Sequence, residues 1–186
     1  MKNVIIKKIS CILVIMGVKE MRNVIFLDYD GVVNSPQWRQ DGNGEWKTYV
    51  NHITDGVVND TQAVQWVSEF CKRYGYDIVV TSTWRLWDNY QDALIRAGLR
   101  EGIKIDRTED LSNSNNLFQT RGRGHEIADY LWSHSDIEEY LIFDDESWEL
   151  INFNNLLEHL VFCKNGFYHW EFIEAQNLRH KLYATK

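Results

Sequence analysis

The fold of this 186-residue chain is decided by one stretch, Val24-Ile25-Phe26-Leu27-Asp28-Tyr29-Asp30-Gly31-Val32-Val33-Asn34. Its first four residues are apolar without polar alternation, which is typical of a central parallel strand covered on both faces. Two acidic residues and a glycine follow the strand directly. Because ligands of parallel sheets bind beyond the carboxyl ends of the strands, we expect Asp28 and Asp30 to lie in a functional site.

Two later apolar runs end in the same way. Residues 77–81 form a predicted strand that ends in Thr81 and Ser82, and residues 140–143 form another that ends in Asp144 and Asp145. Between the first two strands, apolar residues recur at helical spacing from a predicted cap at Asn59 as far as Gly75. Strands that alternate with helices predict an α/β fold with a parallel sheet.

The segment before the last acidic pair is basic. A helix over residues 86–99, a short strand over 102–105 and a polar loop over 107–119 are expected first. Arg121 and Arg123 then precede or open a helix, and cations are disfavoured at that end unless an anion is bound there. The alternative is a solvated basic loop. Lys164, after a last strand near residue 160, is a second candidate phosphate cation or a surface lysine.

The motifs together resemble a known superfamily. Asp-x-Asp-Gly, a strand ending in Thr or Ser, a basic residue and a late Asp-Asp pair occur here in the order of the haloacid dehalogenase (HAD) superfamily. Asp-Gly-Val-Val-Asn, Thr-Ser-Thr-Trp-Arg and Arg-Gly-His-Glu-Ile are further similar to the small HAD domain of Swiss-Army-knife RNA repair proteins, over most of residues 22–182. The resemblance implies a Rossmannoid three-layer fold with a mainly parallel central sheet, helices on both faces, a flap after the first strand and no large cap domain.

The same resemblance implies a Mg2+-dependent phosphatase that works through an aspartyl phosphate. Asp28 would be the nucleophile and Asp30 the general acid and base. The implied metal ligands are Asp28, the Asp30 carbonyl, and Asp144 or Asp145. The implied phosphate-binding residues are Thr81, Ser82, Arg123 and Arg85, although Arg85 could equally form an ion pair with a nearby acid.

The sequence leaves several substrate classes open. Capless members of the superfamily tend to act on large substrates, which favours RNA or DNA ends, and Trp38, Trp46 and Tyr49 of the expected flap over residues 35–56 could stack on a base or simply pack the flap. The net charge of −7 and the pI near 5.3 argue against a broad grip on a polyanion, so nucleotides and small phosphates remain candidates. A third hypothesis is a binding module that has lost catalysis.

Composition indicates one domain in a reducing compartment. The 44% hydrophobic content suits a single core, which we expect to span residues 21–186. Residues 1–20 hold a short apolar run with a poor cleavage site, so we expect an extra segment outside the fold, with Met21 as the natural start and a membrane tether as the alternative. The three widely spaced cysteines indicate reduced thiols, which predicts a cytoplasmic protein without stable membrane association. The six histidines form no zinc signature.

Overall fold

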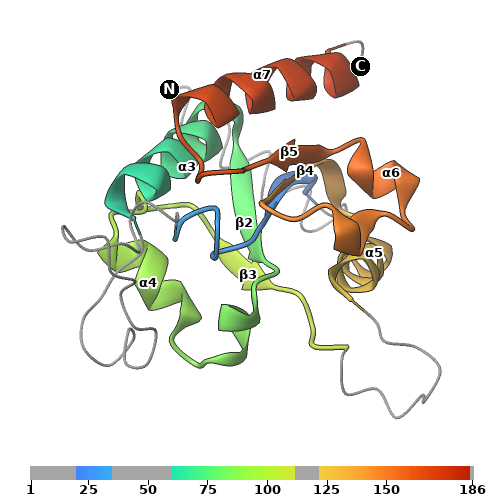
Figure 1. Ribbon diagram of the computed structural model, residues 1–186, viewed down its shortest axis with the longest axis horizontal. Helices are drawn as coiled ribbons and strands as arrows, with labels where there is room; N and C mark the ends of the chain where they lie inside the picture. Colours follow the sequence, from blue (N-terminus) through green and yellow to red (C-terminus); the bar gives the residue numbers. More distant parts are fainter. Residues whose placement is uncertain (1–19, 35–59, 112–121, 185–186) are drawn as a thin grey trace.

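The core of the chain is a five-stranded, all-parallel sheet in the order β3-β2-β1-β4-β5 (Figure 1). A computed structural model describes residues 20–34, 60–111 and 122–184. The predicted α/β class is confirmed. The strands are β1 (Arg22–Leu27), β2 (Tyr76–Val80), β3 (Ile105–Arg107), β4 (Ile137–Asp144) and β5 (Leu160–Phe162). The helices are α3 (Thr61–Tyr74), η2 (Thr83–Leu86), α4 (Tyr90–Arg96), α5 (Arg123–Ser133), η3 (Trp148–Leu150), α6 (Asn154–Leu157) and α7 (His169–Tyr183).

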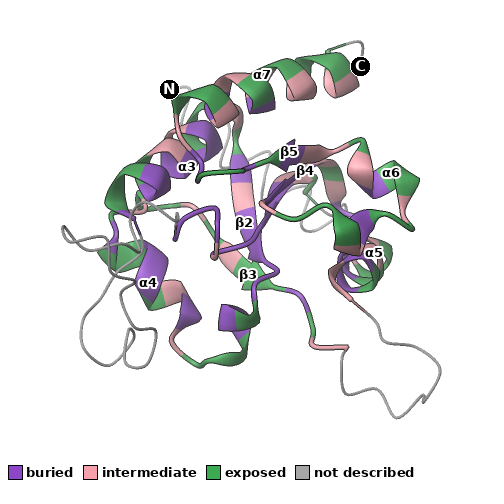
Figure 2. Cartoon of the chain, in the orientation of Figure 1, coloured by how far each residue is buried: buried purple, intermediate pink, exposed green. Residues whose placement is uncertain are grey.

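Alternate residues of β1 enter two separate apolar clusters, which makes the fold three-layered. Ile25 and Leu27 pack with residues of α3, α4 and α7 on one face of the sheet. Val24 and Phe26 pack with residues of α5, η3 and α6 on the other. All four side chains are completely buried, as the burial colouring of the central strands illustrates (Figure 2). The uninterrupted apolar run of β1 is therefore explained by its two covered faces.

The strand register brings three motifs to one edge of the sheet. Leu27 at the end of β1 pairs with Val80 of β2 and with Phe143 of β4. The Asp28 N–H donates to the Phe143 carbonyl and the Thr81 N–H donates to the Leu27 carbonyl, each at 3.0 Å. Because these hydrogen bonds continue the ladder past the last apolar residue, the polar residues that follow all leave the sheet at the same level.

Two predicted elements were misplaced. The third strand occupies Ile105–Arg107 rather than 102–105, because Gly102 lies in a left-handed turn with φ of 81° and Ile105 is the residue that pairs with Ile78 of β2. The helix expected over 86–99 is instead the 3-10 helix η2 followed by the seven-residue α4. The short helices η3 and α6 were not predicted.

Several predictions fall outside the described residues. They concern residues 1–19, the flap over residues 35–56 with its aromatic side chains, and Arg121. Within the ranges that are described, no helix is both long enough and apolar enough to cross a membrane.

The cap of α3 lies one residue later than Asn59, at Asp60. Its Oδ1 accepts hydrogen bonds from the N–H groups of Gln62 at 3.0 Å and Ala63 at 3.3 Å, and its Oδ2 accepts one from the Tyr168 hydroxyl. The side chain therefore satisfies two free N–H groups of the helix and joins α3 to the start of α7.

We expect Asp60→Ala to lower the free energy of unfolding by about 1–2 kcal/mol, because the helix cap and the hydrogen bond from the Tyr168 hydroxyl are lost together. Urea denaturation followed by circular dichroism measures this loss. Asn89→Ala is the matched control, since Asn89 caps α4 without a side-chain hydrogen bond. Equal losses in the two variants would contradict the assignment.

Candidate active site

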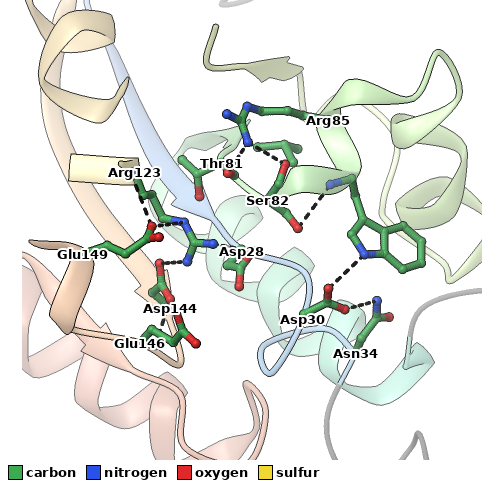
Figure 3. A network of polar contacts seen from close by, with 12 residues as sticks. Asp28, Asp30, Asn34, Thr81, Ser82, Arg85, Arg123, Asp144, Glu146 and Glu149 are labelled. Carbon is green, nitrogen blue, oxygen red and sulfur yellow. Dashed lines mark hydrogen bonds and ion pairs between the residues drawn. The ribbon is translucent and has the colours of Figure 1, made fainter. Parts of the chain in front are cut away.

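Three carboxylates meet where β1 and β4 end. Asp28, Asp144 and Asp145 each place one carboxylate oxygen within 4.8 Å of the others. Asp28 and Asp144 are buried and Asp145 is partly exposed. Figure 3 shows Asp28 and Asp144 side by side at the ends of their strands. The structure thus brings together residues that are more than 110 positions apart in the sequence.

Gly31 makes the close approach of Asp145 possible. A Cβ atom built on Gly31 would lie 2.0 Å from both Cγ and Oδ2 of Asp145, and the φ angle of Gly31 is +81°. Any side chain at this position would displace the Asp145 carboxylate as well as strain the backbone. The glycine of the Asp-x-Asp-Gly motif is therefore required by the shape of the carboxylate cluster.

Arg123, the first residue of α5, supplies positive charge to the cluster. Its Nη1 lies 2.5 Å from Asp144 Oδ2, its Nη2 3.5 Å from Asp28 Oδ1, and its Nε 3.5 Å from Glu149 Oε2 (Figure 3). Lys164, the other described candidate, is exposed after β5. Of the two, Arg123 is the cation placed beside Asp28.

The electrostatics of the cluster favour a bound cation. Burial raises the pKa of Asp28 to about 7, against the opposing effect of Arg123 and reinforced by Asp144. Burial also raises the pKa of Asp144 and of Asp145 to about 6. For Arg123, burial works against the charged form, but Asp28 and Asp144 outweigh it and the pKa is raised.

These three carboxylates fit Mg2+. The ion prefers hard oxygen ligands, and a divalent charge would relieve the mutual repulsion and the loss of hydration that raise their pKa values. The Asp30 carboxylate is not part of this cluster, so the ligand expected from Asp30 is still its main-chain carbonyl, which stays a prediction.

Two hydroxyl groups follow β2 at the same edge. Thr81 is 1% exposed, and its Oγ1 has no hydrogen-bond partner among the described residues. Ser82 is equally buried, and its Oγ accepts a long hydrogen bond of 3.5 Å from the Trp84 N–H. A buried hydroxyl without a partner is unfavourable, so Thr81 is suited to bind an oxygen that arrives with a ligand.

Arg85 is held by the protein itself. Its Nη1 donates to the carbonyls of Thr81 at 2.7 Å and Ser82 at 3.0 Å, its Nε donates to the Thr108 carbonyl at 3.2 Å, and its Nη2 lies 2.6 Å from Glu126 Oε1. The side chain is 5% exposed. The alternative of an ion pair with a nearby acid is thus the arrangement that the structure contains.

Four residues of the site were not assigned a role from the sequence. Trp84 and Asn34 donate to Asp30, while Glu126 and Glu149 pair with the two arginines. Glu126 offered one signal, its place in the Arg-Gly-His-Glu-Ile motif at the predicted start of a helix. Glu149 lies in η3, whose short sequence carries no periodicity that could have placed it.

We expect Mg2+ to stabilise the protein in a pH-dependent manner. Carboxyl groups whose pKa is raised by folding stabilise the fold in acid, and this stability is lost as the pH rises through about 6 to 7. The difference in Tm between Mg2+ and EDTA should therefore be near zero at about pH 5 and reach several degrees at about pH 8. Differential scanning fluorimetry measures this difference.

Asp145→Asn tests whether the response to Mg2+ comes from binding at the carboxylate cluster or from binding elsewhere on the protein. The variant should have a higher Tm than the wild type in EDTA at about pH 8, because one repelling carboxylate is gone, and a smaller response to Mg2+. Asp92→Asn, at an exposed position of α4, is the control and should change neither quantity appreciably. A Mg2+ response that is independent of pH, or unchanged in Asp145→Asn, would refute the metal site.

Comparison with known proteins adds one finding. A family model described as "HAD domain in Swiss Army Knife RNA repair proteins" matches residues 24–167. No curated protein and no solved structure gave a significant match. The matched range begins in β1, ends after β5 and contains every residue of the site described above. The chain therefore belongs to the HAD superfamily, in the family of HAD domains found in Swiss Army Knife RNA repair proteins.

Proposed function

We propose that the chain is a phosphatase that hydrolyses phosphoric monoesters through an aspartyl phosphate on Asp28. The observation that carries the proposal is the meeting of Asp28, Asp144 and Asp145 around one arginine at the carboxyl edge of the sheet. Membership in the HAD superfamily supports a hydrolase of this class. The cytoplasmic location predicted above belongs to the same proposal.

The metal site of the proposal consists of Asp28, Asp144, Asp145 and the Asp30 carbonyl. Bound there, Mg2+ would supply the positive charge that lets an anionic carboxylate approach an anionic phosphate. The raised pKa values of Asp28 and Asp144 support this assignment, because burial alone makes their ionised forms unfavourable.

The side chains of the site have separate roles in the proposed reaction. An Asp28 oxygen forms a bond to phosphorus as the ester bond breaks, and the Asp30 carboxyl gives a proton to the leaving oxygen. Asp30 then takes a proton from the water that attacks phosphorus, which releases phosphate and regenerates Asp28. Arg123 and the hydroxyls of Thr81 and Ser82 would hold the other phosphoryl oxygens.

Arg85 is best placed in a supporting role. Its hydrogen bonds to the carbonyls of Thr81 and Ser82 occupy both protons of Nη1, and Thr108 and Glu126 engage the other two nitrogens. We therefore move Arg85 from the phosphate-binding set to the residues that fix the loop after β2.

The proposed substrate is a phosphorylated end of RNA or DNA. The family is described from RNA repair proteins, which supports a nucleic-acid substrate for this chain. Stacking of a base on Trp38, Trp46 or Tyr49 remains a prediction, because these side chains lie outside the described residues. Nucleotides and small phosphates remain the alternative, since the chain is acidic overall.

One observation favours a second candidate, an inactive binding module. The 2.5 Å contact between Arg123 and Asp144 occupies an oxygen that would otherwise be available to a metal. An ion pair held in this way would keep the fold without catalysis. Trapping of Asp28 by beryllofluoride distinguishes the two candidates, because the trapped adduct requires both the carboxylate and the metal.

We expect wild-type protein to hydrolyse an aryl phosphate in the presence of Mg2+ and to lose this activity in EDTA. Asp28→Asn should reduce turnover to background, because the amide is a poor nucleophile, while Asp92→Asn should retain it. Release of the aryl alcohol measures turnover. Activity that survives EDTA or the Asp28→Asn substitution would refute the mechanism.

The substrate class is tested by a panel of 3′- and 5′-phosphorylated oligonucleotides against mononucleotides. Stacking is worth about 1–3 kcal/mol per base, so oligonucleotides should have a roughly ten- to hundredfold higher kcat/KM that falls with added salt. Trp46→Ala should lower oligonucleotide turnover and leave aryl phosphate turnover intact. Equal use of mononucleotides without salt dependence would refute the nucleic-acid substrate.

A further inference from the structure

A buried indole connects the loops that follow β1 and β2. Trp84 is 5% exposed, and its Nε1 donates a hydrogen bond of 3.1 Å to Asp30 Oδ2. From another direction, Asn34 Nδ2 donates to Asp30 Oδ1 at 3.2 Å. Both oxygens of Asp30 are thus held by N–H donors, as Figure 3 shows.

The position of the indole donor is set by the core. The Trp84 ring packs against Tyr29 and Trp87, with centroids 5.6 Å and 5.2 Å away. Tyr29 is itself completely buried, and its hydroxyl donates to the Tyr90 carbonyl at 2.8 Å. Trp84 therefore presents its N–H from a rigid platform that ties the loop after β1 to that after β2.

Given the phosphatase function proposed above, we propose that Trp84 is a positioning residue that aims Asp30 for its two proton transfers. An indole N–H can only donate a hydrogen bond. Asp30 Oδ2 must therefore stay an acceptor in both protonation states, because a proton on it would face the indole hydrogen.

Asp30 Oδ1 is therefore the oxygen that exchanges the proton in the proposed mechanism. Its neighbour Asn34 suits this role, because a side-chain amide can donate to a carboxylate through nitrogen or, after rotation, accept from a carboxylic acid through oxygen. In the first half-reaction the Oδ1 proton passes to the leaving oxygen as the ester bond breaks. In the second, Oδ1 takes a proton from the attacking water as the bond between Asp28 and phosphorus breaks.

Trp84→Phe removes the N–H and keeps an aromatic ring in the core. We expect turnover of an alkyl phosphate to fall about ten- to hundredfold, because its leaving oxygen must be protonated, and general acid–base catalysis is typically worth about 100-fold or more. An aryl phosphate with a good leaving group should still phosphorylate Asp28 rapidly. With this substrate, Trp84→Phe should therefore release a burst of aryl alcohol and then turn over slowly, because hydrolysis of the aspartyl phosphate still needs Asp30.

Two comparisons separate positioning from a structural role. Trp132→Phe is the control, since this exposed indole of α5 is not part of the platform around Trp84, and it should stay within about twofold of the wild type. In an Asp30→Asn background, Trp84→Phe should have no further effect, because Trp84 acts through Asp30. Absence of the aryl alcohol burst in Trp84→Phe, or additive losses in the double variant, would overturn the proposal.

NMR spectroscopy tests the proposal without the Trp84→Phe variant, and so also where that variant does not fold, because Trp84 stays in the protein. The indole N–H resonance of Trp84 should shift in Asp30→Asn, whereas the resonance of Trp132 should not, and an unmoved Trp84 resonance would overturn the proposal. An inactive wild type would refute the phosphatase function and the positioning role together. An active wild type in which Trp84→Phe behaves like Trp132→Phe would refute the positioning role alone.

Discussion

The arrangement of the site depends on the buried guanidinium of Arg85. Its donors hold the carbonyls of Thr81 and Ser82 at the end of β2, the Thr108 carbonyl after β3 and the Glu126 carboxylate in α5. A buried charge is tolerated only when it is paired and hydrogen-bonded, so these groups must stay together for the fold to persist. The same constraint keeps the first turn of α5, and with it Arg123, against the carboxylates.

The charge balance around Arg123 explains why this region is better suited to binding than to stability. One guanidinium faces the carboxylates of Asp28, Asp144 and Glu149, and Asp145 adds a further acid. Burial raises the pKa of Asp28, Asp144 and Asp145, which means that their ionised forms are unfavourable in the folded chain. A cation would complete the charge balance, and a phosphate could enter only after that excess is neutralised.

The ends of the central strands could be predicted from the sequence because their signals are local. Apolar runs that stop at Asp28, Thr81 and Asp144 report both the burial of the strand and the start of the site. The bonds of Arg85 to Glu126 and of Trp84 to Asp30 join residues 41 and 54 positions apart, so no local pattern contains them. The edge strand β3 was misplaced because its one half-buried and two exposed residues carry little apolar signal.

The short helix η2 gives neighbouring residues opposite tasks. Arg85 points toward α5 and holds the backbone beneath Thr81 and Ser82, whereas Trp84 points toward the loop after β1 and holds Asp30. Because η2 has only four residues, a shift that moved one contact would move the other. The turn η2 therefore fixes the positions of both the phosphate-binding residues and the residue that would transfer protons. Productive alignment of the two is thus a property of the folded backbone and does not have to be imposed by the substrate.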